Sequence, residues 1–413
     1  MGLDPKRTVA DLRELQQLTG DENGAQRVAW TDTWERAREW LRGKVAGTGA
    51  EESVDAAGNQ WFTLRGASDR VVLIGGHIDS VPNGGWLDGA LNVMAGVEVL
   101  RRLDEEGEPA VTVRLVNWAD EEGARFGRSL FGSSAAAGSM ADQDELRARR
   151  DANGIALPDA LSEHGVYLDS ALDARSELDG AAAYLELHIE QGPVLESLDL
   201  PLGVVLGTFG VERHQVTFRG QAAHAGSTPM DKRRDALAGA AKLELEIREI
   251  ANRTADGAVC TMGGVVTKPG IVTSVVETAE CLLDQRHLEA ARLASMLDEA
   301  KRASQRFAHE ENIDVEWERI WNIEPILFDD ALIELAHESI MEVAGTSHRL
   351  PSGPLHDAAE VARAGVPTVM LFVQSLRGLS HTKLEETKEE HLELAVQALD
   401  RLTTKTIDRV AAG

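Results

Sequence analysis

The chain has 413 residues, 43% of them hydrophobic and 27% charged, and a formal net charge of −27 at pH 7. Its length exceeds the usual size of one domain, and no apolar stretch reaches the roughly 20 residues of a membrane-spanning helix. Its charge argues against a nucleic-acid partner, because a phosphate backbone is bound by clustered Lys and Arg.

The amino-terminal segment MGLDPKRTVADL lacks the basic and then apolar residues of a secretion signal. Cys260 and Cys281 are the only cysteines, and they form neither a CxxC pair nor a disulfide framework. Both features fit a reducing compartment, so we expect a cytoplasmic protein that does not bind membranes.

The first half of the chain has the pattern of an α/β domain. Residues 7–48 have the apolar spacing of helices, as in TDTWERAREWLRGKV. From about residue 60 to 208, short apolar runs such as VVLIGG, VTVRLVNWAD and AAAYLELHI alternate with longer amphipathic segments. This alternation predicts a mostly parallel sheet with helices on both faces. Within it, DQDELRARRDANG (142–154) predicts a charged helix that faces solvent.

Residues 209–325 have a different pattern, in which strand-like runs and two long amphipathic helices follow the order βαββαβ. This order predicts a small sheet with both helices packed on one face. The earlier alternation then resumes and ends in a helix from Lys388 to about Arg409. We therefore predict an α/β domain formed by residues 1–208 and 326–413, interrupted by an α+β insertion of residues 209–325.

Histidines and acids recur in the predicted loops of the α/β domain. These residues are His77 with Asp79, Asp88, the run Asp120-Glu121-Glu122, His188 and His381. In open α/β sheets, ligands bind outside the carboxyl ends of the strands, where such loops converge. A single histidine is more often a hydrogen-bonded structural residue than a ligand. Five loops with the same chemistry favour a site for zinc, cobalt, nickel or manganese instead.

Several other kinds of site are excluded by their missing motifs. His309-Glu310 and His337-Glu338 begin like HExxH, but neither has a second histidine four residues after the first. The chain contains no GxGxxG, GxxxxGK[ST] or GxSxG motif. The first acidic loop is therefore neither a dinucleotide site nor a nucleophile elbow.

Six runs of the sequence resemble the M20-type metallohydrolases, specifically the hydantoinase/carbamoylase family of amidases. They are GGHIDSVPNGGWLDG, ADEEGARFG, LHIEQGPVLE, AAHAGSTPMDKRRDAL, SGPLHDA and GLSHTKLEE, in the family's order. The resemblance extends from about Thr8 to the last residue. The family includes N-carbamoyl-L-amino-acid hydrolases, allantoate amidohydrolases, ureidoglycolate amidohydrolases and β-ureidopropionases, so the motifs specify the family more narrowly than the substrate.

The resemblance implies two divalent metal ions (Zn, Mn, Co or Ni) that share one carboxylate. One ion would be held by His77, Asp88 and His188, and the other by Asp88, Glu122 and His381. Asp79 would orient the ring of His77, and Glu121 would be the general base. Two cations about 3.5–4 Å apart lower the pKa of a shared water. A neighbouring carboxylate can then take its proton and later transfer that proton to the leaving nitrogen.

The resemblance also implies that the insertion is a lid that forms a homodimer interface. His224 would help to polarise the scissile carbonyl, either in its own subunit or in the partner's. Arg286 would bind the substrate's carboxylate with its two-pronged guanidinium, and Gln191 would be another substrate contact. A surface salt bridge with Asp284 is the alternative role for Arg286.

The sequence departs from the family pattern at three places. Thr273 stands where the family commonly has Asn in the stretch before the arginine, which changes the groups available to a substrate. Pro354 and Leu355 replace two small residues near the pocket, and Asn92 replaces a glycine. None of these positions is an expected metal ligand, and none is the expected general base Glu121. The departures therefore concern the identity of the substrate rather than the hydrolytic chemistry.

We therefore expect a binuclear metal-dependent amidohydrolase that acts on a linear, non-peptide C–N bond of a small molecule bearing a carboxylate. The first hypothesis is hydrolysis of an N-carbamoyl-L-amino acid to the L-amino acid, carbon dioxide and ammonia. Allantoate or another ureido acid is the second, and an aminoacylase or peptidase on the same fold is the third. A catalytically silent binding protein is a further alternative, against which the intact Glu121 and ligand set argue.

Overall fold

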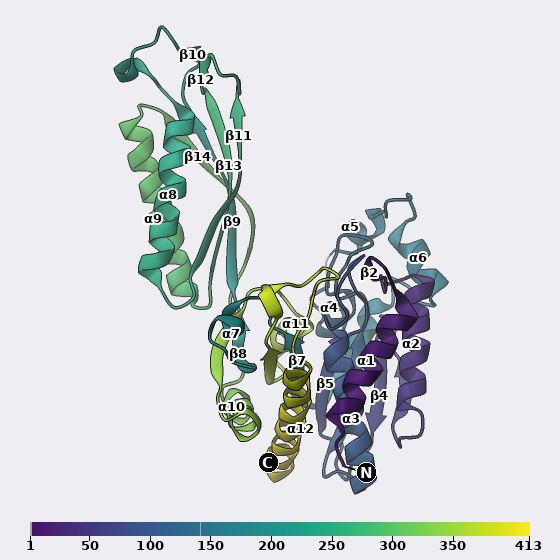
Figure 1. Cartoon of the computed structure of the whole chain (residues 1–413). Helices are drawn as coiled ribbons and strands as arrows, with labels where there is room; N and C mark the ends of the chain where they lie inside the picture. The colour runs from purple at the N-terminus through teal and green to yellow at the C-terminus, as the bar shows by residue number, and fades with distance from the viewer. Residues whose placement is uncertain (1, 141) are drawn as a thin grey trace. The chain divides into compact units, whose positions relative to one another are not determined.

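Two units make up the computed structural model, which describes residues 2–140 and 142–413. The larger unit consists of Met1–Leu206 and Phe328–Gly413, and the inserted unit of Gly207–Leu327 (Figure 1). The chain thus leaves the larger unit once and returns to it. Among the described residues, no helix is both long and apolar enough to cross a membrane.

A nine-stranded sheet forms the centre of the larger unit, with the order β15-β8-β17-β7-β5-β6-β4-β3 and with β16 paired to β8. Its strands are β3 (Glu51–Val54), β4 (Gln60–Leu64), β5 (Val71–His77), β6 (Thr112–Trp118), β7 (Ala181–Ile189), β8 (Leu202–Thr208), β15 (Ile326–Leu327), β16 (His348–Ser352) and β17 (Thr368–Val373). A separate short hairpin joins β1 (Gly20–Asp21) to β2 (Gly24–Ala25).

The sheet is parallel at its centre and antiparallel toward both edges. β6, β5, β7 and β17 are parallel neighbours, whereas β3, β4, β8 and β15 pair antiparallel. The predicted α/β class is confirmed, but the sheet is more mixed than the sequence pattern indicated. The length of the connection between strands explains this difference. β3 and β4 are joined by a short turn, which allows antiparallel pairing, whereas the parallel pair β5 and β6 is joined through a 17-residue helix.

Helices cover both faces of this sheet, and every residue of β5 and of β17 is accordingly buried. The helices are α1 (Pro5–Thr19), α2 (Asp32–Val45), α3 (Ala90–Glu106), α4 (Phe131–Ala137), α5 (Gln143–Ala148), α6 (Leu157–Glu163), α7 (Val194–Ser197), α10 (Asp330–Ala344), α11 (Asp357–Arg363) and α12 (Glu389–Ala412), with 3₁₀ turns η1 (Ala171–Leu178) and η3 (Leu376–Gly378). One set, α1, α3, α10 and α12, packs together on the central strands. A second set pairs α11 with α4 and contacts β7 and β17.

The inserted unit is a four-stranded antiparallel sheet with two helices on one face, as Figure 1 shows. Its elements are β9 (Gly210–Arg219), β10 (Ala223–His224), η2 (Met230–Lys232), α8 (Ala236–Thr254), β11 (Val259–Lys268), β12 (Ser274–Val275), β13 (Thr278–His287), α9 (Ala290–Glu310) and β14 (Asp314–Ile323). The sheet order is β11-β13-β9-β14, and β10 pairs with β12 separately. Its core forms between sheet and helices, where Val216 and Phe218 meet Leu243, Ile247 and Met296.

Candidate active site and metal centre

The predicted ligands of the larger unit come from four neighbouring parallel strands. His77 is the last residue of β5, and His188 lies near the end of β7. The Asp120–Glu122 run follows β6, and His381 lies in the loop after β17. Because the carboxyl ends of parallel strands lie at the same edge of a sheet, these side chains converge.

One ligand group contains His77, Asp88 and His188, all of them buried. The Nε2 atoms of His77 and His188 lie 3.6 and 3.1 Å from Oδ1 of Asp88. Gly89 follows Asp88 with a φ of +62°, and a Cβ there would collide with the His77 ring. This glycine lets the backbone turn into α3 while Asp88 stays against the histidine.

The ring nitrogens of these two histidines have the arrangement that a cation between them and Asp88 requires. Nδ1 of His77 lies 3.1 Å from the Asp79 carbonyl oxygen, and Nδ1 of His188 lies 2.9 Å from the Ile189 carbonyl oxygen. A carbonyl only accepts, so each Nδ1 carries a proton, and Nε2 of each ring presents a lone pair when the imidazole is neutral. Both Nε2 atoms are buried without a hydrogen bond and face a carboxylate oxygen. Two facing acceptors of this kind suit a metal ion between them.

A second ligand group contains Asp88, Glu122 and His381. Nε2 of His381 lies 3.5 Å from Oδ2 of Asp88 and 3.4 Å from Oε2 of Glu122. Asp88 therefore turns one oxygen toward each group, which is the arrangement of a carboxylate that bridges two cations. Within each group, all ligand atoms lie within 4.8 Å of one another.

The buried acids around these groups have strongly shifted pKa values. Burial, helped by the nearby Asp120, raises the pKa of Asp79 to about 8. Burial and the neighbouring carboxylates raise the pKa of Glu121 and of Glu122 well above the ordinary range. Burial also opposes the ionisation of Asp88, but without a cation a protonated His188 holds the pKa of Asp88 below its ordinary range. Such a concentration of buried acids is compatible with full ionisation only when cations offset its charge.

Glu121 lies beside the first ligand group, with Oε2 3.7 Å from Nε2 of His77 and only 8% of the residue exposed. The backbone of its loop is held by the Asp79 carboxylate, which accepts from the N–H groups of Glu121 and Glu122 at 3.3 and 3.2 Å. Asp120 has a φ of +57° and accepts a 2.8 Å hydrogen bond from the Trp30 indole. Glu121 is thereby placed as a partly enclosed carboxylate next to the predicted metal ligands.

Asp79 contacts His77 through its backbone rather than its carboxylate. Its carboxylate Oδ1 lies 3.7 Å from Nδ1 of His77, whereas its backbone carbonyl oxygen lies at 3.1 Å. The carboxylate is turned toward the N–H groups of the acidic loop. Asp79 therefore orients the His77 ring through its main chain and the acidic loop through its side chain.

Gln191 lies in the same cluster of the larger unit. Its Nε2 donates to Oδ2 of Asp88 at 2.8 Å and to the Ser380 hydroxyl at 3.1 Å. Its backbone φ is +56°, a conformation that non-glycine residues seldom adopt and that often occurs at functional sites. The side-chain amide is thus fixed at the edge of the second ligand group.

The inserted unit places two of its three predicted site residues together. His224 pairs with Ser274 between β10 and β12, and the Ala225 N–H donates to the Thr273 carbonyl at 2.8 Å. Arg286 lies at the far end of β13, where Nε and Nη2 donate to Asp284 at 2.7 and 3.2 Å. The ion pair with Asp284 that the sequence offered as an alternative is therefore present.

Four residues near the ligand groups were not assigned by sequence. The His356 ring lies 4.4 Å from that of His188, and Glu385 and Ser380 contact the Asp88 segment. Arg27 is fully buried, with both terminal guanidinium nitrogens lacking a hydrogen bond. His356, Ser380 and Glu385 lie within the quoted SGPLHDA and GLSHTKLEE runs, whereas Arg27 lies in none of the six runs.

Two of the departures from the family pattern have local roles. The side chain of Asn92 is buried in α3, and its Oδ1 accepts a 3.0 Å hydrogen bond from the Leu187 N–H of β7. It therefore ties the helix that follows Asp88 to the strand that carries His188. The Pro354 carbonyl accepts from the Ser352 hydroxyl at 2.8 Å, which closes the turn before His356.

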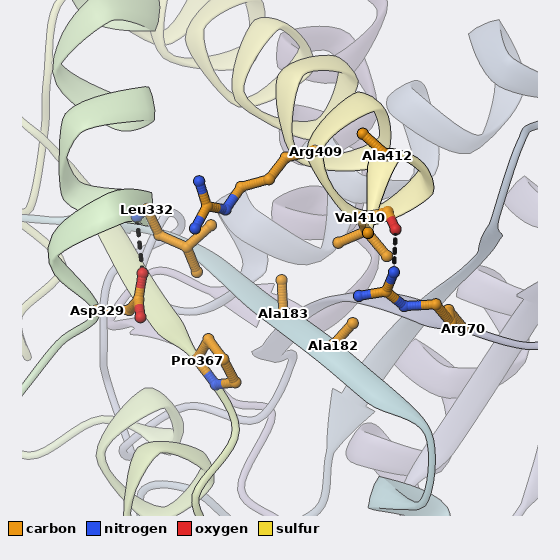
Figure 2. A pocket seen from close by; sticks show the side chains of 10 residues that line it. Arg70, Ala182, Ala183, Asp329, Leu332, Pro367, Arg409, Val410 and Ala412 are labelled. Atoms are coloured by element: carbon orange, nitrogen blue, oxygen red, sulfur yellow. Dashed lines mark hydrogen bonds between the residues drawn. The ribbon is translucent and has the colours of Figure 1, made fainter.

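A separate cavity of about 490 Å³ lies at the opposite ends of the strands. Figure 2 shows Ala182 and Ala183 of β7 in its wall, with Pro367 before β17 and the two arginines Arg70 and Arg409. The Arg70 guanidinium donates to the Val410 carbonyl near the end of α12. None of the predicted site residues lines this cavity, so it is distinct from the metal centre.

Comparisons with known proteins agree with this fold and site. Residues 73–405 match the model of peptidase family M20/M25/M40. An N-carbamoyl-L-amino acid amidohydrolase from Geobacillus stearothermophilus is 36% identical over 91% of this chain and 92% of its own. An allantoate amidohydrolase from Bacillus subtilis is 31% identical over 98% of each chain. A solved amidase of the hydantoinase/carbamoylase family from Burkholderia multivorans is 30% identical, with a TM-score of 0.88 over 98% of each chain.

The fold and the paired ligand groups define a metal-dependent hydrolase that acts on C–N bonds. The chain belongs to peptidase family M20/M25/M40.

Proposed function

We propose that this protein is a binuclear amidohydrolase that converts an N-carbamoyl-L-amino acid and water to the L-amino acid, carbon dioxide and ammonia. The observation that carries the proposal is the shared Asp88, which turns one oxygen to each of two ligand groups beside Glu121. The substrate class is supported by the Geobacillus stearothermophilus relative, whose length this chain covers almost completely.

The residues that would hold two divalent ions (Zn, Mn, Co or Ni) are those of the two ligand groups. His77 and His188 with Asp88 would hold one, and Glu122 and His381 with Asp88 the other. When bound, such ions supply the Lewis acidity that makes water nucleophilic near neutral pH and stabilises charge on the substrate carbonyl.

Glu121 would act as the general base and then as the general acid. Its carboxylate takes a proton from the attacking water and transfers it to the departing nitrogen. The largely buried position of Glu121 keeps bulk water from competing for this proton. The Asp79 carboxylate positions Glu121 by accepting its backbone N–H at 3.3 Å.

The inserted unit would supply substrate contacts and a homodimer interface. Arg286 would bind the substrate carboxylate, and His224 would polarise the scissile carbonyl with Thr273 close by. β13 begins at Thr278 beside the β12 segment, and Arg286 lies eight residues further along it. At about 3.3 Å per residue, Arg286 lies roughly 25 Å from the start of β13, which is the end of the sheet near the β10–β12 pair that carries His224. A small substrate can contact both side chains only if two copies of the chain each contribute one.

Allantoate is the second candidate substrate. The Bacillus subtilis allantoate amidohydrolase matches this chain over 98% of both lengths, and it is 31% identical against 36% for the N-carbamoyl-L-amino acid amidohydrolase. Thr273 and Leu355 depart from the family pattern, and under this second candidate they would contribute to recognising the different substrate.

A substrate panel tests both candidates. Ammonia release would be measured from N-carbamoyl-L-amino acids, allantoate and a ureido acid, and free amino acid from dipeptides and N-acyl amino acids, with Mn²⁺, Co²⁺, Ni²⁺ and Zn²⁺ in turn. The proposal expects N-carbamoyl-L-amino acids to have the highest kcat/KM. Preference for allantoate would favour the second candidate, cleavage of dipeptides or N-acyl amino acids alone would indicate a peptidase or aminoacylase, and turnover of none would indicate a binding protein.

We also propose that the enzyme works in the cytoplasm. Its two cysteines, Cys260 and Cys281, are both free thiols, which a reducing compartment preserves. Fractionation of cells that produce the protein would test this, and recovery in an oxidising compartment would contradict it.

A further inference from the structure

The carboxylate of Glu385 lies buried behind the shared ligand Asp88, although it belongs to neither ligand group. Glu385 is 2% exposed and follows β17 in the loop that also carries His381. A carboxylate is seldom buried unless other groups satisfy it, so its contacts indicate what it does.

Glu385 contacts both the Asp88 segment and the His381 loop. Its Oε1 accepts from the N–H groups of Leu87 and Asp88 at 2.9 and 3.1 Å. Its Oε2 lies 3.1 Å from the Ser380 hydroxyl, which also lies 2.6 Å from Oδ2 of Asp88. Glu385 thus holds the backbone of the shared ligand and, through Ser380, its side chain.

The chain makes space for this carboxylate at Gly85. A Cβ at Gly85 would collide with the carboxylate carbon and both oxygens of Glu385. The close approach of Glu385 to the 85–88 segment therefore depends on a glycine there. Arg27, buried with unpaired guanidinium nitrogens, supplies positive charge whose largest favourable interaction is with Glu385.

His381 is the ligand that most needs such support. Its side chain is 52% exposed, and its φ is +56°, a backbone conformation that persists only when neighbouring contacts enforce it. The other two histidine ligands lie on buried strands of the sheet. Within the loop that carries His381, the buried Glu385 contacts the segment that carries the shared ligand Asp88.

We propose that Glu385 is a positioning residue that fixes Asp88 and the His381 loop relative to each other and so completes the second metal-ligand group. The inference rests on the proposed function, because it assumes that Asp88, Glu122 and His381 hold an ion. Groups that orient ligands in this way typically change metal affinity by about 10–100-fold when they are removed.

The test is metal binding by the full-length protein, measured as Co²⁺ affinity and stoichiometry by calorimetry and by the visible spectrum of the bound ion. The variants are Glu385→Ala and Glu385→Gln, the second of which keeps an oxygen that accepts from Leu87 and Asp88. Glu386→Gln is the matched control, because Glu386 is adjacent but its side chain is 40% exposed and faces Arg13 at 3.7 Å. His381→Ala identifies which spectral change belongs to the second group.

We expect Glu385→Ala to lower the affinity for one ion, the same ion that His381→Ala loses, by about 10–100-fold. The affinity for the other ion should fall by only a few-fold. Glu385→Gln should lie between Glu385→Ala and the wild type, and Glu386→Gln should match the wild type. In the His381→Ala background, Glu385→Ala should add little further loss, because both substitutions remove the same site. A role in stability alone would not reproduce this selectivity between the two ions.

The inference would be overturned if the wild type binds two ions and Glu385→Ala binds both with the wild-type affinity. That result would leave the proposed function intact. Wild-type protein that binds no ion would overturn both. If Glu385→Ala does not fold, Ser380→Ala replaces it, because it cuts the link between the two carboxylates and leaves the Glu385 contacts to Leu87 and Asp88 in place. Unchanged affinity of both ions in Ser380→Ala would then overturn the inference, and selective loss of the His381 ion would support it.

Discussion

The two units place their site residues in opposite environments. In the larger unit, His77 and His188 are each 1% exposed, and their ring orientations are fixed by backbone carbonyls. In the inserted unit, His224 and Thr273 are exposed, and Arg286 forms a partly exposed ion pair with Asp284. Under the proposed function, the larger unit is preorganised for chemistry, whereas the inserted unit would supply contacts that a substrate or second copy completes.

The largest effect is expected from Glu121. Glu121→Gln should lower kcat by about 10³-fold while both ions stay bound, because only the proton-transfer group is lost. Glu122→Gln is the matched neighbour, and it should lose metal as well as activity. Steady-state kinetics and metal analysis on the same preparations check this. Full activity in Glu121→Gln would show that the preorganised carboxylate of the larger unit is not the base.

The two histidine environments within the larger unit predict a difference in metal retention. His188→Ala removes a buried ligand, so we expect loss of one ion and a lower melting temperature. His381→Ala removes a half-exposed ligand, so we expect loss of the other ion with a smaller change in melting temperature. Calorimetric melting and metal analysis after dialysis measure both. Equal destabilisation by the two substitutions would contradict the contrast in burial.

Removal of metal should destabilise the protein more at high pH than at low pH. Without cations, the pKa of Asp79 is raised to about 8, that of Glu385 to about 7 and that of Asp120 to about 6, chiefly by burial. A carboxyl with a raised folded-state pKa favours folding below its unfolded-state pKa, and this contribution is lost as pH rises through the folded-state value. Metal-free protein should therefore lose stability between about pH 4 and pH 8.

Melting temperatures of metal-loaded and chelator-treated protein measure this dependence. The gap between them should widen by roughly 5 °C from about pH 5.5 to about pH 8. Cations replace protons as the counter-charge, so the loaded protein should change less over the same range. A gap that narrows as pH rises would contradict the electrostatic account of the buried acids.

The smallest effect is expected in the inserted unit. Arg286→Lys should raise KM about 10-fold with little change in kcat, because lysine lacks the paired donors that match a carboxylate. Arg213→Lys is the control, since Arg213 also donates to Asp284, at 2.7 Å, but is not predicted to bind substrate. If Arg286→Lys instead lowered kcat alone, the division of roles between the units would be wrong.

The sequence was informative where periodicity and strand ends determine position. The α/β class could be predicted from alternating apolar and amphipathic runs, and the clustering of His77, His188 and the Asp120–Glu122 run from their places after apolar runs. The antiparallel edges were harder to predict, because strand direction depends on connections such as the short turn between β3 and β4. The predicted charged helix of residues 142–154 is shorter in the structure, where α5 spans Gln143–Ala148.

Contacts between distant segments could not be predicted in this way. Glu385 meets Leu87 across almost 300 residues of chain, and Arg27 reaches the Ile78 carbonyl from the amino-terminal region. No local pattern records such pairings. The Asp79 carboxylate likewise turns to the acidic loop rather than to His77 because that loop offers two N–H groups, a choice that only the folded chain determines.

The most direct test of the central claim is a crystal structure of the protein grown with Mn²⁺, with anomalous scattering used to locate the ions. We predict two manganese peaks in each larger unit, one on either side of Asp88, with His77 and His188 at one and Glu122 and His381 at the other. A single peak, or peaks that do not share Asp88, would contradict the binuclear centre proposed for this enzyme.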